Sequence, residues 1–263
     1  REKKKKKNWS TGGNLNTARM GLGSAGTQTA ALTFGGDDTT PAPEYLDLTE
    51  AYNGTSWTAV NTLGTARKFM GSDGTQTSAL TFAGEDASVA EYDNTESWNG
   101  TNWTEINDMN TSARYLRGVG TQSDALGFGG LGPPGALSKT ESWNGTSWFE
   151  LNDLNTGRYL MGGAGNATLA LAIGGDTGTK QSLTESWNGA VWTETNNLNI
   201  TRGYLGGAGT QTTALAFGGL DSSSAVTAAT EEWNAGISVG AWVSGGNMNQ
   251  QRGALAGAFF FFF

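Results

Sequence analysis

Apolar and polar residues alternate in short runs along the whole chain, without the spacing that an amphipathic helix would show. Some runs are apolar and end in glycines, as in Ala125–Gly130 (ALGFGG), and others mix polar and aromatic residues, as in Thr95–Trp98 (TESW). Runs of this length, bounded by Gly, Asn and Asp, are typical of β-strands. The pattern therefore predicts an all-β chain.

The runs recur in a fixed order. Thr140–Arg158 reads TESWNGTSWFELNDLNTGR, near-copies begin at Thr49, Thr95 and Thr184, and a stretched copy begins at Thr230. The second Trp of each copy, with one further Trp upstream, gives the series Trp9, Trp57, Trp103, Trp148, Trp192 and Trp242. The steps in this series are 48, 46, 45, 44 and 50 residues. A period in the mid-forties indicates a radial or stacked array of units.

Each unit contains four predicted strands. A Gly-rich run such as Tyr159–Gly165 comes first, and an apolar run ending in glycines, such as Ala170–Gly175, comes second. A Thr-Glu-aromatic run and a Trp-led run follow. Four short strands per repeat predict the blade of a β-propeller.

An Asn-Gly pair joins the last two strands of most units. At Asn99-Gly100 it predicts a two-residue type I′ turn that places Trp98 opposite Thr101. Because opposite and alternate residues share a face, Glu96, Trp98 and Trp103 then project to one side. Two indoles on one face need a neighbouring sheet to cover them, so we expect these tryptophans in the core rather than as sugar-binding platforms.

An Arg and a Glu also recur once per unit. A Glu on a buried face must be paired or hydrogen-bonded, because an unpaired buried charge costs several kcal/mol. We therefore expect most of these side chains to be buried and bonded: Arg67, Arg114, Arg158, Arg202, Glu50, Glu96, Glu141 and Glu185.

The order Gly-Gly, aromatic, Trp, Arg resembles the kelch repeat, from about Trp9 to Gly257. The chain differs from kelch repeats in its closer pair of aromatics and in its Asn-Gly turn. The NGTSW motif is also similar to repeats of viral and bacterial surface or tail-associated proteins. The resemblance implies a non-catalytic binding or structural module, in an extracellular or virion-associated setting.

The repeat count predicts a single propeller domain over residues 1–263. Residues 13–251 hold five repeats, residues 1–12 would supply the outer strands of a closing blade, and residues 252–263 its inner strand. Closure by both termini leaves no exposed sheet edge. Six blades is the preferred count, and five and seven are the alternatives.

The amino-acid composition excludes several classes of catalytic site, metal site and partner. The chain has no His and no Cys, which excludes Ser-His-Asp and Cys-His catalysis and thiolate- or imidazole-bound metals. Its net charge of −8 argues against nucleic acid as a partner, and it lacks an apolar run of the ~20 residues that a membrane span needs. We expect no cofactor, with calcium as the one cation that its acidic loops could bind.

The five segments between the second and third strands differ between units, although the strands repeat: Asp37–Leu48, Glu85–Asn94, Leu131–Lys139, Asp176–Leu183 and Leu220–Ala229. They all join the same two strands, so they lie on one face, and loops on a rigid scaffold are where binding residues concentrate. We expect this rim to contact a protein or glycan surface through Asp37, Asp38, Glu44, Tyr45, Asp86 and Asp176. The alternatives are a lectin with one weak sugar site per blade, an enzyme that hydrolyses glycosides with paired carboxylates, and loops that vary without a role.

Overall fold

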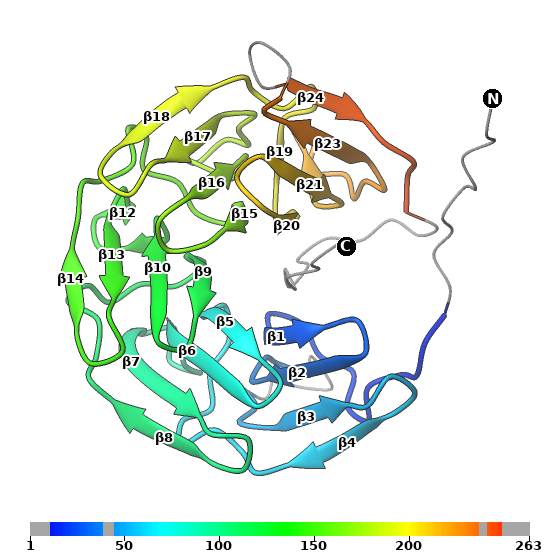
Figure 1. Ribbon diagram of the computed structural model, residues 1–263, viewed down its shortest axis with the longest axis vertical. Helices are drawn as coiled ribbons and strands as arrows, with labels where there is room; N and C mark the ends of the chain where they lie inside the picture. The colour runs from blue at the N-terminus through cyan, green and yellow to red at the C-terminus, as the bar shows by residue number, and fades with distance from the viewer. Residues whose placement is uncertain (1–10, 39–44, 237–240, 249–263) are drawn as a thin grey trace.

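The protein is a ring of radial sheets, as the computed structural model in Figure 1 shows; it describes residues 11–38, 45–236 and 241–248. Five four-stranded antiparallel sheets follow one another around a central axis. This arrangement confirms the predicted all-β propeller with four-stranded blades, and five blades are present in the described residues. No helix in those ranges has the length and apolar character of a membrane span.

The blades are numbered in chain order, and their strands are given from the axis outward. Blade 1 contains β1 (Gly23–Thr27), β2 (Ala30–Phe34), β3 (Thr49–Tyr52) and β4 (Trp57–Val60). Blade 2 contains β5 (Gly71–Thr75), β6 (Ser78–Glu85), β7 (Glu91–Trp98) and β8 (Trp103–Ile106). Blade 3 contains β9 (Arg117–Thr121), β10 (Asp124–Phe128), β13 (Thr140–Trp143) and β14 (Trp148–Glu150). Blade 4 contains β15 (Gly162–Gly165), β16 (Ala170–Ile173), β17 (Thr184–Trp187) and β18 (Trp192–Thr195). Blade 5 contains β20 (Gly206–Gly209), β21 (Thr213–Phe217), β23 (Thr230–Asn234) and β24 (Ala241–Ser244).

Two short ribbons lie outside the blades. They are β11 (Leu131–Gly132) with β12 (Gly135–Ala136), and β19 (Arg202–Gly203) with β22 (Leu220–Asp221). Both involve the variable segments, so these segments extend the scaffold at one face of the ring.

The outer hairpins differ from the predicted turn. Trp98 pairs with Trp103, not Thr101, so four residues form the loop. The Asn99 side-chain oxygen accepts hydrogen bonds from the backbone N–H groups of Thr101 and Asn102, and Gly100 alone has a positive φ, at 91°. The predicted type I′ turn is therefore wrong, because the Asn side chain closes a longer loop. The loop is longer than predicted by two residues, so the same residues of the two strands still face one side. Trp98 and Trp103 therefore share a face as expected, with ring centroids 5.4 Å apart.

Each junction between blades is built around the second tryptophan of a blade. The indole Nε1 of Trp192 donates to Thr140 Oγ1 of the preceding blade at 3.0 Å, and the indole ring packs 5.0 Å from the ring of Phe128. The same bond recurs as Trp103 to Thr49, Trp148 to Thr95 and Trp242 to Thr184. The core prediction is confirmed for most of the tryptophans, since Trp98, Trp143, Trp148, Trp187, Trp192, Trp233 and Trp242 are buried, whereas Trp57 and Trp103 are half-buried.

The arginines and glutamates form a second element of the junctions. The Nη2 atom of Arg158 donates to Glu185 Oε1 at 2.8 Å, with both side chains buried. Equivalent pairs join Arg19 to Glu50, Arg67 to Glu96 and Arg202 to Glu231. The expectation is confirmed for most of the set, but Arg114 is an exception: its side chain is 18% exposed and pairs with Glu85, not with Glu141.

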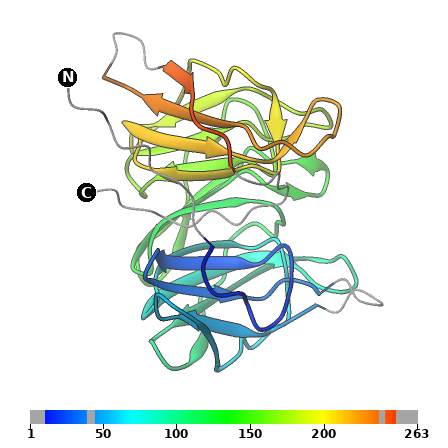
Figure 2. The ribbon, with the colours of Figure 1, turned by 90° about the vertical axis from the view of Figure 1, so that its right-hand side faces the viewer.

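The described residues form no blade between blades 1 and 5, a sector seen face-on in Figure 1 and edge-on in Figure 2. The predicted sixth blade uses residues 1–12 and 252–263, which lie outside the described residues except for residues 11 and 12. On the blade 1 side, Asn16 and Arg19 donate to Glu50, as the segment after an outer strand does at the other junctions. On the blade 5 side, Thr230 Oγ1 is buried and has no hydrogen-bond partner within the described part of the chain.

Candidate binding face at the channel mouth

The face that carries the variable segments has a ring of five residues around the axis, four of which are bulky. One residue per blade, just before the innermost strand, has a left-handed backbone: Gly21 (φ 66°), Phe69 (56°), Tyr115 (57°), Leu160 (56°) and Tyr204 (57°). We call these five residues the channel mouth. For a residue with a Cβ this conformation costs about 1–2 kcal/mol, so four blades hold a strained residue where the first has glycine.

Backbone hydrogen bonds link the channel mouth from blade to blade. Phe69 N–H donates to the Gly21 carbonyl at 2.7 Å, and Tyr115 N–H to the Phe69 carbonyl at 2.9 Å. The series continues from Leu160 to Tyr115 at 3.0 Å and from Tyr204 to Leu160 at 2.9 Å. The left-handed turn thus orients each amide toward the preceding blade. This accounts for the backbone conformation, but glycine would adopt it without strain.

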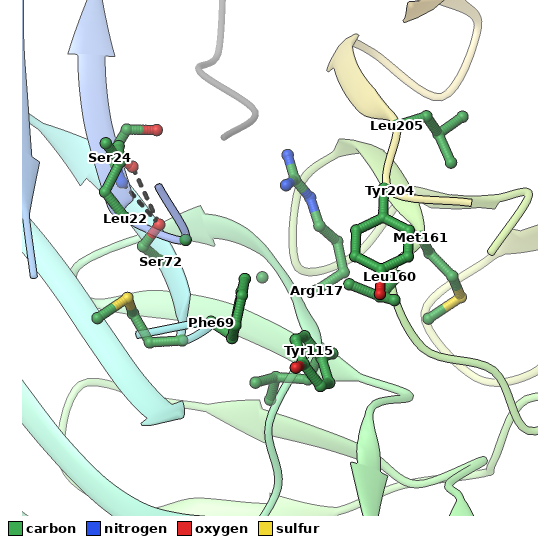
Figure 3. Close-up of a pocket in the computed structure, with 14 residues that line it drawn as sticks. Leu22, Ser24, Phe69, Ser72, Tyr115, Arg117, Leu160, Met161, Tyr204 and Leu205 are labelled. Carbon is green, nitrogen blue, oxygen red and sulfur yellow. Dashed lines mark hydrogen bonds between the residues drawn. The ribbon is translucent and has the colours of Figure 1, made fainter. Parts of the chain in front are cut away.

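The side chains of the channel mouth surround a small cavity of about 80 Å³. Figure 3 shows Phe69, Tyr115 and Tyr204 around it, with Arg117 between them. The rings of Phe69 and Tyr115 are tilted, with centroids 4.3 Å apart. Burial raises the pKa of the Tyr115 hydroxyl, and the Glu85 carboxylate adds to the shift. Tyr115 is therefore a neutral hydrogen-bonding group at physiological pH.

Arg117 also lines this cavity. It begins β9, where blades 1, 2, 4 and 5 have glycine, and its Nη2 donates to the Gly207 carbonyl at 3.4 Å. Gly163 makes room for it, because a Cβ there would lie 2.6 Å from Arg117 Cγ. Burial lowers the pKa of Arg117, and the charge of Asp73 opposes this shift.

Charged residues of the variable segments and of the turns beside them form a rim outside the channel mouth. Lys68 bonds to Asp37 and lies 3.8 Å from Glu85, which also bonds to Arg114. We call Asp37, Lys68, Glu85, Arg114, Asp176 and Lys180 the charged rim. Burial lowers the pKa of Lys68, but its hydrogen bonds with Asp37 and Tyr45 outweigh burial and raise it.

The cations of the charged rim also lie over aromatic rings. Lys68 Nζ is 4.4 Å from the centroid of Tyr45, and Arg114 Cζ is 5.3 Å from that of Tyr115. Lys180 Nζ is 5.5 Å from the centroid of Tyr204. The rim is therefore a network of paired charges coupled to the channel mouth, not a set of free carboxylates.

The residues predicted from the sequence lie on this face in separate groups. Asp37 and Tyr45 meet at Lys68, whereas Asp176 pairs with Lys180 at 2.6 Å in blade 4. Asp86 closes its own loop: bonds from Ser88, Tyr92 and Ala90 lower its pKa to about 2. Asp38 is half-buried, and Glu44 lies outside the described residues.

The sequence reasoning missed the channel mouth, Arg117 and Lys68. Two signals could have revealed the mouth: Gly21 occupies the place of an aromatic or leucine in the other units, and Phe69, Tyr115 and Tyr204 precede the Gly-rich strand at the same offset. Arg117 carried a further signal, because it replaces the glycine that begins this strand in the other units.

The opposite end of the channel has a different character. A pocket of about 430 Å³ is lined by threonines and glutamines of the turns between the two inner strands of each blade. Asp73 lies at its base, 2% exposed, and accepts a hydrogen bond from Gly74 N–H at 2.6 Å, while its Oδ2 has no partner among the described residues. Burial raises the pKa of Asp73 to about 8, against the opposing hydrogen bond from Gly74 and charge of Arg117.

Neither end of the channel brings together a metal site in the residues that the structure describes, where no three Asp or Glu side chains cluster as ligands. Comparison with protein-family models and with curated proteins finds no match for this chain. The resemblance to kelch repeats therefore rests on the sequence pattern and on the shared propeller architecture.

Proposed function

We propose that the protein is a non-catalytic binding module that contacts a protein or glycan surface through the channel mouth and the charged rim. The extracellular or virion-associated setting implied by the NGTSW repeats belongs to the same proposal. No catalytic role is assigned to the carboxylates of the rim, because Asp37, Glu85 and Asp176 each pair with a cation.

One observation carries the proposal. Phe69, Tyr115, Leu160 and Tyr204 keep a left-handed backbone at about 1–2 kcal/mol each, although Gly21 satisfies the same position in blade 1. Strained residues persist where the surrounding structure fixes them, and they concentrate at functional sites. Tyr and Phe are also the residues that enrich binding interfaces.

The lectin with one site per blade has less support. Its sugar platforms would be the repeated tryptophans, and in blades 3, 4 and 5 both tryptophans of each hairpin are buried. In these blades the second indole N–H is bonded within a junction. A single site on the axis, where the blades differ, fits the structure better than a repeated one.

The test compares two faces of one scaffold. Labelled wild-type protein, a Tyr115→Gly/Tyr204→Gly variant and a Thr27→Ala variant are applied to a glycan array and to an array of surface proteins. Glycine accepts the left-handed backbone, so we expect the double variant to fold and to lose at least about tenfold in affinity, or 1.4 kcal/mol. Thr27 is exposed at the opposite mouth, so its variant should bind like the wild type.

Two outcomes would contradict the proposal. Binding that survives in the double variant, or is lost in Thr27→Ala, would place the contact on the opposite face. A folded wild-type protein that binds nothing on either array would argue for a purely structural role.

A further inference from the structure

Four of the five blades hold an arginine side chain in the same buried cradle. In blade 4 the Nη1 of Arg158 donates to the carbonyls of Gly174 and Leu183, both at 2.8 Å, while Nη2 donates to Glu185. The arginine comes from the turn before the blade, and the acceptors come from the end of the second strand, the start of the third strand and the residue just before it. The same three kinds of acceptor receive Arg19, Arg67 and Arg202.

Blade 3 has the acceptors without the arginine. Gly129 N–H donates to the Lys139 carbonyl at 2.8 Å, as Gly174 N–H does to the Leu183 carbonyl at 2.8 Å in blade 4. Glu141 is 1% exposed, and its Oε2 accepts bonds from Asn110, as that of Glu185 does from Asn155. The backbone of the cradle is therefore preserved.

Ala113 occupies the place of the arginine. Its carbonyl accepts from Gly84 N–H, as the carbonyl of Arg158 accepts from Gly130 N–H, and it follows Asn110 by three residues, as Arg158 follows Asn155. Arg114, one residue later, extends to the charged rim and pairs with Glu85 and Glu91. The guanidinium of blade 3 is thus absent from its cradle.

The consequence is an unsatisfied carboxylate oxygen. Glu141 Oε1 is buried and has no hydrogen-bond partner in the described part of the chain. Gly127, which pairs with Glu141, has no side chain where blades 1 and 2 have Thr33 and Thr81. A Cβ at Gly127 would lie 2.9 Å from the ring of Phe82, so the group missing beside Glu141 is the arginine guanidinium alone.

We propose that this cradle is a binding site for a small guanidinium cation, held by Glu141 Oε1 and the carbonyls of Gly129 and Lys139. A guanidinium is planar and presents several N–H donors in a fixed fork, which matches two carbonyls and a carboxylate. It is also more weakly hydrated than an ammonium, so its transfer into a buried site costs less. The arginines of the other four blades show the geometry that it would adopt.

The test is chemical rescue of thermal stability. Guanidinium chloride is added up to about 20 mM, far below denaturing concentrations, with NaCl adjusted to hold the ionic strength constant. Wild-type protein should gain about 2 °C or more in Tm, because the ligand binds only the folded state. Ala113→Arg, which fills the cradle from within, should start at a higher Tm and show no response.

Two further variants keep the test decisive. Glu141→Gln retains the shape of the cradle but removes its charge, so the response should disappear even if Ala113→Arg fails to fold. Arg158→Ala creates a second vacant cradle in blade 4, so its response should exceed that of the wild type. Equal responses in the wild type and Glu141→Gln, or no response in the wild type, would overturn the proposal.

Discussion

The junctions between blades and the central channel use buried polar groups in opposite ways. At the junctions an indole N–H meets a threonine hydroxyl, and at four of the five blades an arginine meets a glutamate, so charged donors and acceptors find each other. Along the channel the mouth residues are strained, and Asp73 Oδ2 is a buried carboxylate oxygen without a partner among the described residues. An unpartnered Nε does not distinguish the two regions, because Arg117 shares it with the junction residues Arg67 and Arg202. The comparison indicates that the junctions stabilise the fold and that the strained and unpaired groups of the channel destabilise it.

The largest effect should come from breaking a junction. Arg202→Ala leaves Glu231 buried, with a side chain 1% exposed, and without its charge partner. We expect a loss of about 3–5 kcal/mol in the free energy of unfolding, measured by urea denaturation. Lys139→Ala is the control: it removes a pair with Glu150 whose side chains are 42% and 56% exposed, and should cost less than about 1 kcal/mol. Similar losses in both variants would mean that the junction arginines are not special.

A pH titration tests the channel. The folded-state pKa of Asp73 is raised to about 8 from an ordinary 3.8, so folding disfavours its ionised form. The penalty is absent below pH 4, grows as the pH rises and is complete above pH 8. Asp73→Asn removes the titrating group, so the variant should gain stability relative to the wild type across this window, by more than about 1 kcal/mol. A stability difference that does not change with pH would contradict the assignment.

The smallest effect concerns strain in the scaffold itself. Ala83 has a φ of 60° where Gly35, Gly129, Gly174 and Gly218 stand in the other blades. Ala83→Gly should raise the free energy of unfolding by about 1 kcal/mol or less, because relief of strain exceeds the loss of one buried methyl group. Ala79→Gly, at an equally buried residue of β6 without a positive φ, should lower it. Thermal denaturation of both variants measures whether each substitution raises or lowers the stability.

Much of the fold could be predicted from the sequence because the repeat carries it. The tryptophan period and the strand pattern each predict a four-stranded blade. The alternation of side chains along paired strands is enough to place the indoles of Trp98 and Trp103 on one face. The turn at Asn99 could not be predicted, since Asn-Gly is compatible with two-residue and four-residue loops, and the choice depends on a side-chain hydrogen bond.

The candidate site was only partly predictable. The sequence indicated the face on which the candidate site lies, because variable segments interrupt constant strands. The left-handed backbone of the channel mouth could be inferred only from Gly21, which stands at the equivalent place in blade 1, because the residue types of Tyr115 and Tyr204 do not signal it. The sequence also aligned Arg114 with the other arginines, although the spacing from Asn110 assigns that place to Ala113.

Because backbone hydrogen bonds link the channel mouth from blade to blade, its main chain has few donors and acceptors left for a ligand. The amides of Phe69, Tyr115, Leu160 and Tyr204, and the carbonyls of Gly21, Phe69, Tyr115 and Leu160, are already engaged with one another. In the proposed binding at the channel mouth, recognition would therefore rest mainly on side chains. Each blade contributes one residue to the channel mouth, so single substitutions there could change the binding specificity while the scaffold stays the same.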